Sequence, residues 1–256
     1  MTDHVLIEKA DKLLILTLNR PDKKNALTRA MYRTLSTEIA NADNDRNIRC
    51  ILIKGNGDTF TAGNDLAEFA AIGAKPKPTS EDGNPLLPTL ARARTPIVAA
   101  VNGRAVGIGV TMLLHCDMVI VADNALLAAP FVNLALVPEA ASTLLMPLRI
   151  GHLRAFEMFV LGEPVNAEKA VSWGLANKSV PMADLHAVAR TAASAIAARA
   201  PAAVVATKSL MRDESLLLER MKEETGHFAR QLKSAEFNEA FAAFSERRAP
   251  DFSKFG

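Results

Sequence analysis

The stretch PIVAAVNGRAVGIG, residues 96–109, decides which fold we expect for this chain. It starts with Ile97–Val101, an apolar run rich in β-branched residues and alanine, which is typical of a buried strand. Asn102-Gly103 then predicts a turn, and Gly107-Ile108-Gly109 leads into Val110–His115, which has a helical pattern. The stretch therefore predicts a strand that ends in glycine turns and continues into a helix.

Residues 59–66, TFTAGNDL, repeat this pattern with a second glycine turn at Ala62-Gly63-Asn64-Asp65. Two turns of this kind can supply a pair of backbone N–H groups to an oxyanion hole, and helix N-termini add a favourable dipole. Taken alone, the turns are better explained as tight connections between strand and helix. The two explanations stay open at this point.

The remaining elements alternate in the same way. The predicted strands are Val5–Glu8 and Leu13–Leu18 (a hairpin), Ile48–Lys54, Met118–Ala122 and Ala125–Ala128. Thr28 is placed to cap a helix whose apolar face carries Met31, Leu35 and Ile39. Helices dominate from Ala141 onward, and Pro201 breaks the alanine-rich residues 183–206 into two of them. The order predicts an α/β protein with a helical C-terminal part.

Composition excludes several classes of protein. Hydrophobic residues make up 49% and charged residues 23% of 256, which excludes a disordered chain, a collagen-like chain and a disulfide scaffold. The 30 Lys and Arg balance the 28 Asp and Glu to a net charge of +2, whereas a general nucleic-acid binder usually carries a stronger imbalance. Cys50 and Cys116 lie in no CxxC pair, so we expect reduced core cysteines and no metal site.

Targeting signals and several catalytic motifs are missing from the sequence. The first twelve residues, MTDHVLIEKADK, contain no apolar run of a signal peptide, and polar residues interrupt the apolar stretch 96–122 too often for a membrane span. We therefore expect a cytoplasmic protein with no membrane partner. The sequence has no GxxxxGK[ST], GxGxxG, HExxH or GxSxG pattern, which argues against several nucleotide-binding, zinc-protease and hydrolase classes.

A series of short motifs, taken in their order along the chain, indicates the class of function. They are Lys24-Asn25-Ala26-Leu27, residues 60–66, residues 96–107, Cys116-Asp117, Gly162-Glu163-Pro164, Gly174-Leu175 and Ala206-Thr207-Lys208. In this order they resemble the crotonase family, the enoyl-CoA hydratases and isomerases, over nearly the whole chain. Within that family the chain is most similar to the Δ3,Δ2-enoyl-CoA isomerases, enzymes of fatty acid metabolism and β-oxidation.

The resemblance implies a fold, a substrate class and an assembly. The expected fold is an α/β crotonase-type spiral of ββα units in residues 1–200, followed by a C-terminal helical trimerisation region in residues 201–256. The substrate would be an acyl-CoA thioester, with coenzyme A as part of the substrate and no metal or redox cofactor. The expected assembly is a homotrimer or a dimer of trimers, and no nucleic acid is expected as a partner.

The family's site residues can be carried over by position. The oxyanion donors would be the backbone N–H groups of Asn64 and Ile108. The second position is commonly Gly in the family, but a backbone N–H keeps its role unless the bulk of Ile108 shifts the turn. The substrate-binding residues would be Lys24, Ala26, Leu27, Ala62, Asp65, Leu66, Thr111 and Phe131.

Two carboxylates of the family's hydratases are missing here. Those enzymes carry one Glu early in the helix after the second oxyanion turn and another just after a strand-end proline. The matching positions are Thr111 and Phe131, the latter following Pro130. Syn addition of water needs an activated water and a proton for C2. Thr and Phe cannot replace that pair of carboxylates.

Glu139 is the carboxylate that remains nearby in the sequence. Because Pro138 and Glu139 are good early helix residues, Glu139 could be an ordinary acid in the first turn of a helix. The resemblance favours a catalytic role instead, since Δ3,Δ2-enoyl-CoA isomerases often place their single catalytic Glu in this segment. The surrounding residues are apolar, so we expect a raised pKa and a competent base.

We therefore expect an enzyme that moves the double bond of 3-enoyl-CoA to 2-trans-enoyl-CoA. Glu139 would remove the C2 proton, the two N–H groups would hold the dienolate oxygen, and the acid would return the proton at C4. One alternative is an enoyl-CoA hydratase, or a hydrolase or decarboxylase of CoA thioesters on the same scaffold. Another is a non-catalytic acyl-CoA-binding homologue.

Basic residues are expected near the phosphates of coenzyme A. They form one cluster around the first motif and another near the C-terminus: Arg20, Lys23, Lys24 and Arg29, and Arg247, Arg248 and Lys254. Lys24 is the preferred candidate because it adjoins Asn25-Ala26-Leu27. Each of these residues is equally explained as a solvated surface charge. The loop Gly73–Pro88 is expected to border the acyl tunnel.

Overall fold

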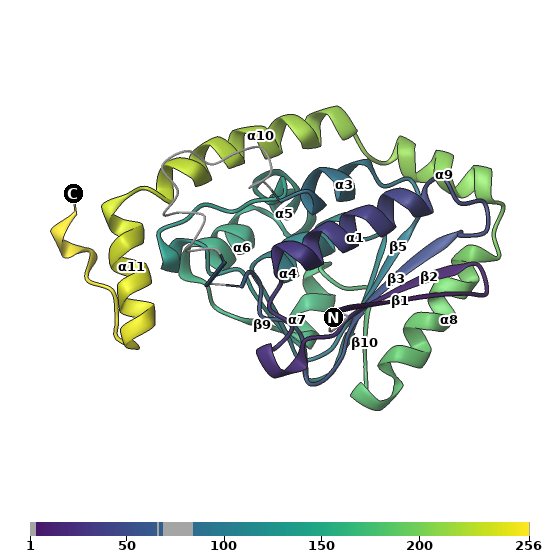
Figure 1. The fold of residues 1–256 in the computed structure, drawn as a ribbon, viewed down its shortest axis with the longest axis horizontal. Helices are drawn as coiled ribbons and strands as arrows, with labels where there is room; N and C mark the ends of the chain where they lie inside the picture. Colours follow the sequence, from purple (N-terminus) through teal and green to yellow (C-terminus); the bar gives the residue numbers. More distant parts are fainter. Residues whose placement is uncertain (1–3, 66, 69–83, 256) are drawn as a thin grey trace.

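The computed structural model describes residues 4–65, 67–68 and 84–255 (Figure 1). The larger of its two sheets has six strands in the order β1-β2-β3-β5-β7-β10. The hairpin strands, β1 (Val5–Ala10) and β2 (Leu13–Leu18), pair antiparallel, as predicted. The following strands pair parallel: β3 (Cys50–Gly55), β5 (Ile97–Val101), β7 (Met118–Ala122) and β10 (Lys178–Val180).

The second sheet has four short strands in the order β4-β6-β8-β9. They are β4 (Thr59–Thr61), β6 (Arg104–Val106), β8 (Leu126–Ala128) and β9 (Val165–Asn166), and only the last pair is antiparallel. Each of β3, β5 and β7 is followed along the chain by a strand of this second sheet. These successive pairs confirm the expected α/β spiral.

Helices connect and cover the sheets. The N-terminal and central ones are α1 (Arg29–Ala42), α3 (Leu86–Arg92), α4 (Ile108–Thr111), α5 (Ser142–Ile150), α6 (His152–Phe156) and α7 (Ala167–Trp173). The C-terminal ones are α8 (Leu185–Ala197), α9 (Pro201–Leu210), α10 (Glu214–Gln231) and α11 (Ala235–Glu246). Thr28 caps α1 by accepting a hydrogen bond from the Met31 N–H at 3.3 Å, and Pro201 begins α9, both as predicted. None of the described helices combines the length and apolar character of a membrane span.

Short 3-10 helices and one π-helical turn complete the connections. They are η1 (Pro21–Lys23), η3 (Met112–His115), η4 (Val132–Leu134), η5 (Glu157–Leu161, a π-helical turn), η6 (Met182–Asp184) and η7 (Phe252–Lys254). The helical pattern predicted over residues 110–115 is therefore the end of α4 and the whole of η3.

The central strands of the larger sheet, β2, β3, β5 and β7, are buried on both faces. Alternate residues of β2, such as Leu13 and Ile15, pack on one face with an alanine stripe of α8. Leu14 and Leu16 point to the opposite face, into the main core with α1. Because alanine is small, α8 approaches the strands closely. Burial of both faces explains why these strands read as continuous apolar runs.

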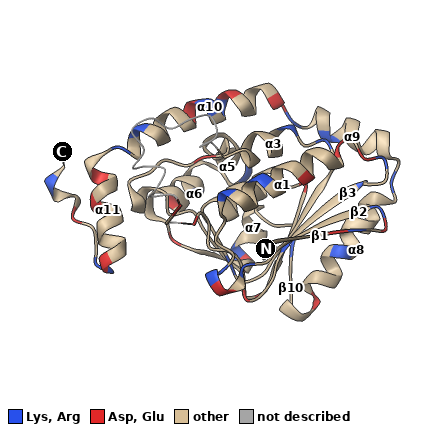
Figure 2. Ribbon diagram, in the orientation of Figure 1, with Lys and Arg blue, Asp and Glu red and all other residues tan. Residues whose placement is uncertain are grey.

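Lys208 anchors the C-terminal helices to this core. Its Nζ is buried and lies 2.7 Å from Asp117 Oδ2 and 3.0 Å from the Thr95 carbonyl oxygen. The same Asp117 oxygen accepts the Ile97 N–H at 2.8 Å. The two motif residues therefore tie α9 to the start of β5. From there α10 crosses the molecule to α11 (Figure 1), and acidic and basic residues are interspersed along α10 (Figure 2).

Candidate active site

The two glycine turns lie together because the strands before them are parallel neighbours. β4 and β6 pair parallel, so their turns leave the second sheet at the same edge. A Cβ at Gly63 would lie 2.9 Å from the Val106 carbonyl oxygen, and Gly63 has a φ of +92°. A Cβ at Gly109 would lie 2.6 Å from Thr61 Cγ2. Close contact between the turns therefore requires glycine at both positions.

Within the part of the chain that the structure describes, two backbone N–H groups in these turns have no protein acceptor. The neighbouring amides are occupied: Leu27 N–H donates to Gly63 O at 2.7 Å, and Asp65 N–H donates to Leu27 O at 3.0 Å. Among the described residues, the N–H groups of Asn64 and Ile108 donate to no protein oxygen. Both residues border the same cavity. This is the arrangement that an oxyanion hole requires.

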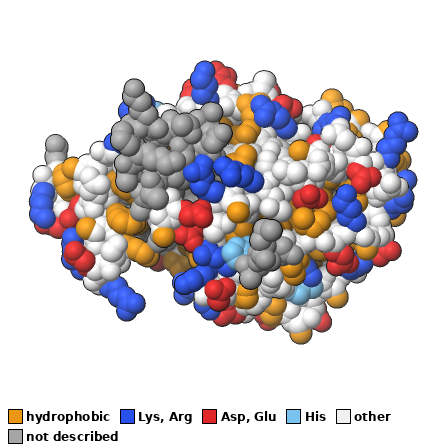
Figure 3. All heavy atoms as spheres, viewed as in Figure 1, with side chains coloured by type: hydrophobic (Ala, Val, Ile, Leu, Met, Phe, Trp, Pro, Cys, Tyr) orange, Lys and Arg blue, Asp and Glu red, His pale blue; other side chains and the backbone are white. Residues whose placement is uncertain are grey.

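The cavity beside these groups has a volume of about 570 Å³ and mainly apolar walls. Figure 3 shows hydrophobic side chains gathered between α11 and the body of the molecule. The lining residues come from the two turns, from the segment after β8 and from the C-terminal helices: Lys23, Ala26, Ala62, Gly63, Asn64, Asp65, Val106, Gly107, Ile108, Pro130, Phe131, Asn133, Leu134, Leu136, Phe228, Ala240, Phe244, Arg248 and Pro250. Its size and character suit an acyl chain.

Most of the site residues expected from the sequence meet at this cavity. Those that line it are Ala26, Ala62, Asn64, Asp65, Ile108 and Phe131. Lys24 lines a neighbouring cavity of about 460 Å³, which shares Ala62 with the first. The described lining does not include Leu27, Thr111 or Glu139. Leu66 and residues 73–83 of the loop Gly73–Pro88 lie outside the described residues.

The two positions that hold Glu in the hydratases are occupied here by buried, uncharged residues, Phe131 and Thr111. Phe131 is buried, with its ring centroid 6.2 Å from that of Phe159 in an edge-to-face arrangement. Thr111 is fully buried, and its Oγ1 has no hydrogen-bond partner among the described residues. Neither side chain carries a charge with which to activate a water molecule.

Glu139 lies on a left-handed turn, not in a helix. α5 begins only at Ser142, and Ala140 and Ala141 have φ angles of +67° and +53°. The interpretation of Glu139 as a first-turn helix acid is therefore wrong. Its Oε1 is shielded from solvent and has no hydrogen-bond partner among the described residues. Burial, with the nearby negative charge of Glu224, raises the pKa of Glu139 to about 7.

Tyr32 binds the oxyanion turn and lies close enough to Glu139 to be affected by its charge, and our sequence-based prediction did not include it. Its hydroxyl donates to Asn64 Oδ1 at 2.5 Å. Burial raises the pKa of Tyr32 well above its ordinary value, and the negative charges of Glu139 and Glu68 add to this effect. Tyr32 therefore remains a neutral donor beside both groups. The only signal in the sequence was its place beside the apolar stripe of α1.

Most of the basic residues expected near the phosphates make ion pairs. Arg20 lies 2.6 Å from Asp65 and also donates to the Ala26 carbonyl oxygen at 3.1 Å, so it braces the first motif. Arg248 pairs with Glu239 and Glu246. Lys24 lies 2.8 Å from Asp58, and both of these side chains are more than half exposed. An exposed ion pair contributes little and exchanges partners readily.

Comparison with known proteins agrees with this geometry. A family profile described as "Enoyl-CoA hydratase/isomerase" matches residues 8–254. This chain belongs to the enoyl-CoA hydratase/isomerase family. A crystal structure of an enoyl-CoA hydratase/isomerase from Pseudoalteromonas atlantica T6c superposes with a TM-score of 0.92 at 42% identity, over 98% of this chain and 100% of that chain.

Named relatives in the enoyl-CoA hydratase/isomerase family include both activities. A probable enoyl-CoA hydratase of Rhodobacter capsulatus is 33% identical over 255 residues, 96% of each chain. The 1,2-epoxyphenylacetyl-CoA isomerase of Escherichia coli K12 is 31% identical over 265 residues, 99% of each chain. Enoyl-CoA hydratases are the more frequent among the similar proteins. The chain is thus a CoA-thioester enzyme of this family, a hydratase or an isomerase.

Proposed function

We propose that this enzyme is a Δ3,Δ2-enoyl-CoA isomerase in which Glu139 is the single acid–base residue. The observation that carries the proposal is a shielded carboxyl group with a pKa raised to about 7, whose charge acts on Tyr32, a residue bonded to Asn64 at the rim of the apolar cavity. Among the described residues, the N–H groups of Asn64 and Ile108 at this cavity have no protein acceptor. A general base is most effective when its pKa is close to the working pH. Tyr32 supports the placement of Glu139 beside the oxyanion turn.

The reaction needs only proton movement. Glu139 takes the C2 proton of a 3-enoyl thioester, and the electrons of that bond delocalise onto the thioester oxygen and over the former double bond. The N–H groups of Asn64 and Ile108 bind this oxygen. The protonated carboxyl group then donates the same proton to C4, which leaves the double bond between C2 and C3 and returns Glu139 to its starting state. No water enters the balance.

Hydration is the second candidate, because most of the named relatives are enoyl-CoA hydratases. It requires a water molecule held beside C3 and a base to activate it. In this chain, Phe131 takes the place of one of the two hydratase carboxylates and forms part of the apolar cavity wall. The buried Thr111 takes the place of the other. These residues favour isomerisation over hydration.

Incubation of the enzyme with 3-enoyl and 2-enoyl thioesters of several chain lengths tests the proposal. We expect the 3-enoyl substrates to gain the absorbance of the conjugated thioester, and the 2-enoyl substrates to keep theirs. Rapid loss of absorbance from 2-enoyl thioesters would indicate a hydratase. Tight binding of acyl-CoA without turnover of either series would indicate a non-catalytic acyl-CoA-binding protein.

The substrate-binding proposal places the phosphates of coenzyme A near Lys24. This side chain lines the cavity of about 460 Å³ next to the apolar one, with Arg104 and Asn124 in the same wall. A phosphate can displace the exposed partner Asp58, because Lys24 then exchanges its charge-assisted bond to Asp58 for one to the phosphate. The acyl part would then extend past Ala62 and Ala26 to the oxyanion turns.

Glu139 should also lower the stability of the folded enzyme at high pH. Its pKa is about 7 in the folded protein against an ordinary value of 4.5, so the folded state binds this proton more tightly than the unfolded chain does. The free energy of unfolding therefore falls as the pH rises from 4.5 through 7. We expect Glu139→Gln to be more stable than wild type by roughly 2 kcal/mol at pH 8, and urea denaturation at pH 8 and pH 5 measures the difference. A difference equal at both pH values would contradict this expectation.

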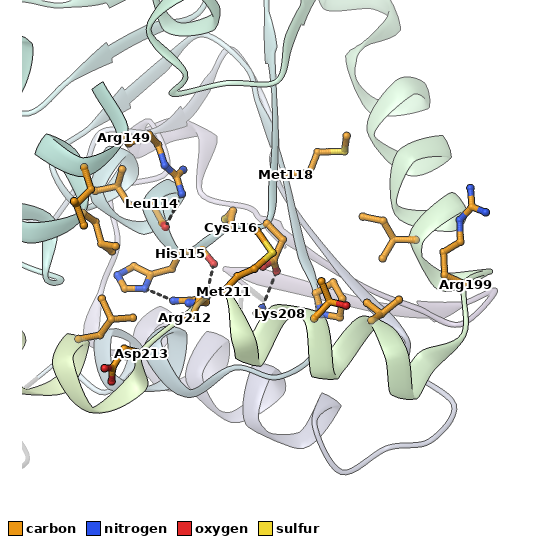
Figure 4. Close-up of a pocket in the computed structure, with 18 of the residues that line it drawn as sticks. Leu114, His115, Cys116, Met118, Arg149, Arg199, Lys208, Met211, Arg212 and Asp213 are labelled. Carbon is orange, nitrogen blue, oxygen red and sulfur yellow. Dashed lines mark hydrogen bonds and ion pairs between the residues drawn. The ribbon is translucent and has the colours of Figure 1, made fainter. Parts of the chain in front are cut away.

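A large apolar groove supports the proposal of a homotrimer or a dimer of trimers. It has a volume of about 960 Å³ and lies between α5, α8 and α9, with Arg149, Arg199, Lys208 and Arg212 among its walls (Figure 4). Large apolar side chains near it are strongly exposed: Leu148 at 75%, Leu210 at 89% and Met211 at 79%. An apolar surface of this kind marks an interface. The C-terminal helices would supply part of it.

Light scattering should give a mass of three or six times 27.5 kDa. A variant with both Leu148→Glu and Met211→Glu should give a smaller mass, because assembly would bury unpaired carboxylates in the interface between subunits. The matched control is the exposed change Leu6→Glu on the opposite, hairpin part of the chain. A mass of 27.5 kDa for wild type would contradict the assembly.

A further inference from the structure

We propose that Glu224 is a positioning residue for Glu139: from α10 it holds the left-handed turn that carries this carboxylate. The inference rests on the proposed function, in which Glu139 is the base. Glu224 is 83 residues away in the sequence from Ala141, the first residue that it binds. It is nearly fully buried, at 5% exposure, on the face of α10 that also carries Leu217 and Met221.

The carboxylate of Glu224 makes three hydrogen bonds to the start of α5. The Ala141 N–H donates to Oε2 at 2.6 Å, the Thr143 N–H donates to Oε1 at 2.9 Å, and the Thr143 hydroxyl donates to Oε1 at 2.6 Å. Hydrogen bonds to an ionised acceptor are among the strongest in proteins. Glu224 thus caps α5 from a distant helix. The residue at the N-cap of α5 is Ala141, whose own side chain cannot accept a hydrogen bond.

The turn needs this support because its backbone is unfavourable. Ala140 and Ala141 both adopt positive φ angles, which are sterically unfavourable for residues with a Cβ. Such a conformation persists only where surrounding contacts hold it. Without the clamp at Ala141, the turn could relax and move the Glu139 side chain away from its place beside Tyr32.

His115 holds the same turn from the other side. Arg212 Nη2 lies 2.8 Å from His115 Nδ1, and since Arg can only donate, Nδ1 is the acceptor (Figure 4). The proton of the neutral ring is therefore on Nε2, which donates to the Ala140 carbonyl oxygen at 2.7 Å. Burial, with the charge of Arg212, lowers the pKa of His115 to about 3, so the ring stays neutral at working pH. Two buried side chains thus hold the two ends of one peptide group, the one that joins Ala140 to Ala141: His115 binds its C=O and Glu224 binds its N–H.

The charge of Glu224 also acts on Glu139. Its negative charge is, after burial, the second cause of the raised pKa of Glu139. The other titratable or charged groups around the turn lie on α1, α5, η3, α9–α10 connection and α10: Tyr32, Arg149, His115, Arg212 and Arg220. Among the described residues, only Glu224 both accepts hydrogen bonds from the turn and adds a negative charge that raises the pKa of Glu139.

The test is the pH dependence of kcat/KM for a 3-enoyl thioester in Glu224→Gln. Gln cannot accept at both oxygen positions and carries no charge. We expect kcat to fall about 10–100-fold through misplacement of the base, KM to change little, and the acid limb of the profile to move to lower pH. The matched control is Glu219→Gln, an exposed carboxylate of the same helix, which should behave as wild type.

Two further variants separate charge from support and cover a failure of Glu224→Gln to fold. Glu224→Asp and Thr143→Val keep the negative charge but weaken the clamp, so kcat should fall while the acid limb stays in place. A Glu224→Gln enzyme with wild-type kcat and profile, or with lowered kcat and an unmoved acid limb, would overturn the inference. If Glu224→Gln does not fold, a Thr143→Val enzyme with unchanged kcat overturns it. Retention of activity by Glu139→Gln would instead contradict the proposed function itself.

Discussion

Glu139→Gln should lower kcat for a 3-enoyl thioester by about 10²–10⁴-fold, the range expected when a general acid–base group is lost. The amide has nearly the same shape as the carboxyl group and occupies the same turn, but it cannot accept the C2 proton. Binding of an unreactive acyl-CoA thioether should remain close to that of wild type. Stopped-flow kinetics and calorimetric titration measure the two quantities.

The control for this variant is Glu163→Gln, which changes an exposed carboxylate between η5 and β9. It should leave both quantities unchanged. An unchanged kcat in Glu139→Gln would show that another group removes the proton. Loss of binding together with kcat would show that Glu139 supports the cavity and does not act on the substrate.

Ile108→Pro should lower kcat by about 10²–10³-fold, because proline removes one oxyanion donor and leaves the other. Backbone donors are seldom accessible to mutation, but Ile108 is the first residue of α4, where a helix tolerates proline. The preceding Gly107 has φ and ψ angles of 56° and −115°, and a glycine accepts restrictions that a larger residue before proline does not. The substitution therefore removes the N–H with little change elsewhere in the backbone.

The matched control is Ile108→Ala. Both variants lose the fully buried Ile side chain, but only Ile108→Pro loses the N–H. The difference in kcat between them measures the replacement of the N–H donor by the proline ring carbon Cδ at the place of the dienolate oxygen. Equal activity of the two folded variants would contradict the role of Ile108 as an oxyanion donor.

Local chemistry made much of the fold predictable. The hairpin at residues 5–18, the cap at Thr28 and the break at Pro201 each depend on neighbouring residues, and the structure confirms all three. The glycine turns at Gly63 and Gly109 were also recognisable, because a close approach of two backbones requires glycine. The ordered motifs then indicated the family.

The part of the site that sequence reasoning missed depends on contacts across the chain. Pro138 and Glu139 are residue types that often begin a helix. The left-handed turn found there instead is held by His115 and Glu224, which bind the peptide group between Ala140 and Ala141. A sign of this was present in α10, where Glu224 interrupts an apolar stripe between Met221 and Phe228. A buried carboxylate on such a stripe requires partners, and these are found only in the folded structure.

The most direct test of the central claim is the mass of the product formed from a 3-enoyl thioester. Isomerisation keeps the mass of the substrate, whereas hydration adds one water. After complete conversion by wild-type enzyme, we predict a conjugated 2-trans-enoyl thioester of unchanged mass, with hydrated product below about one part in a hundred, because Thr111 and Phe131 stand at the positions of the carboxylates that activate water in the hydratases. Accumulation of a 3-hydroxyacyl thioester, or no conversion of the 3-enoyl substrate, would contradict the account.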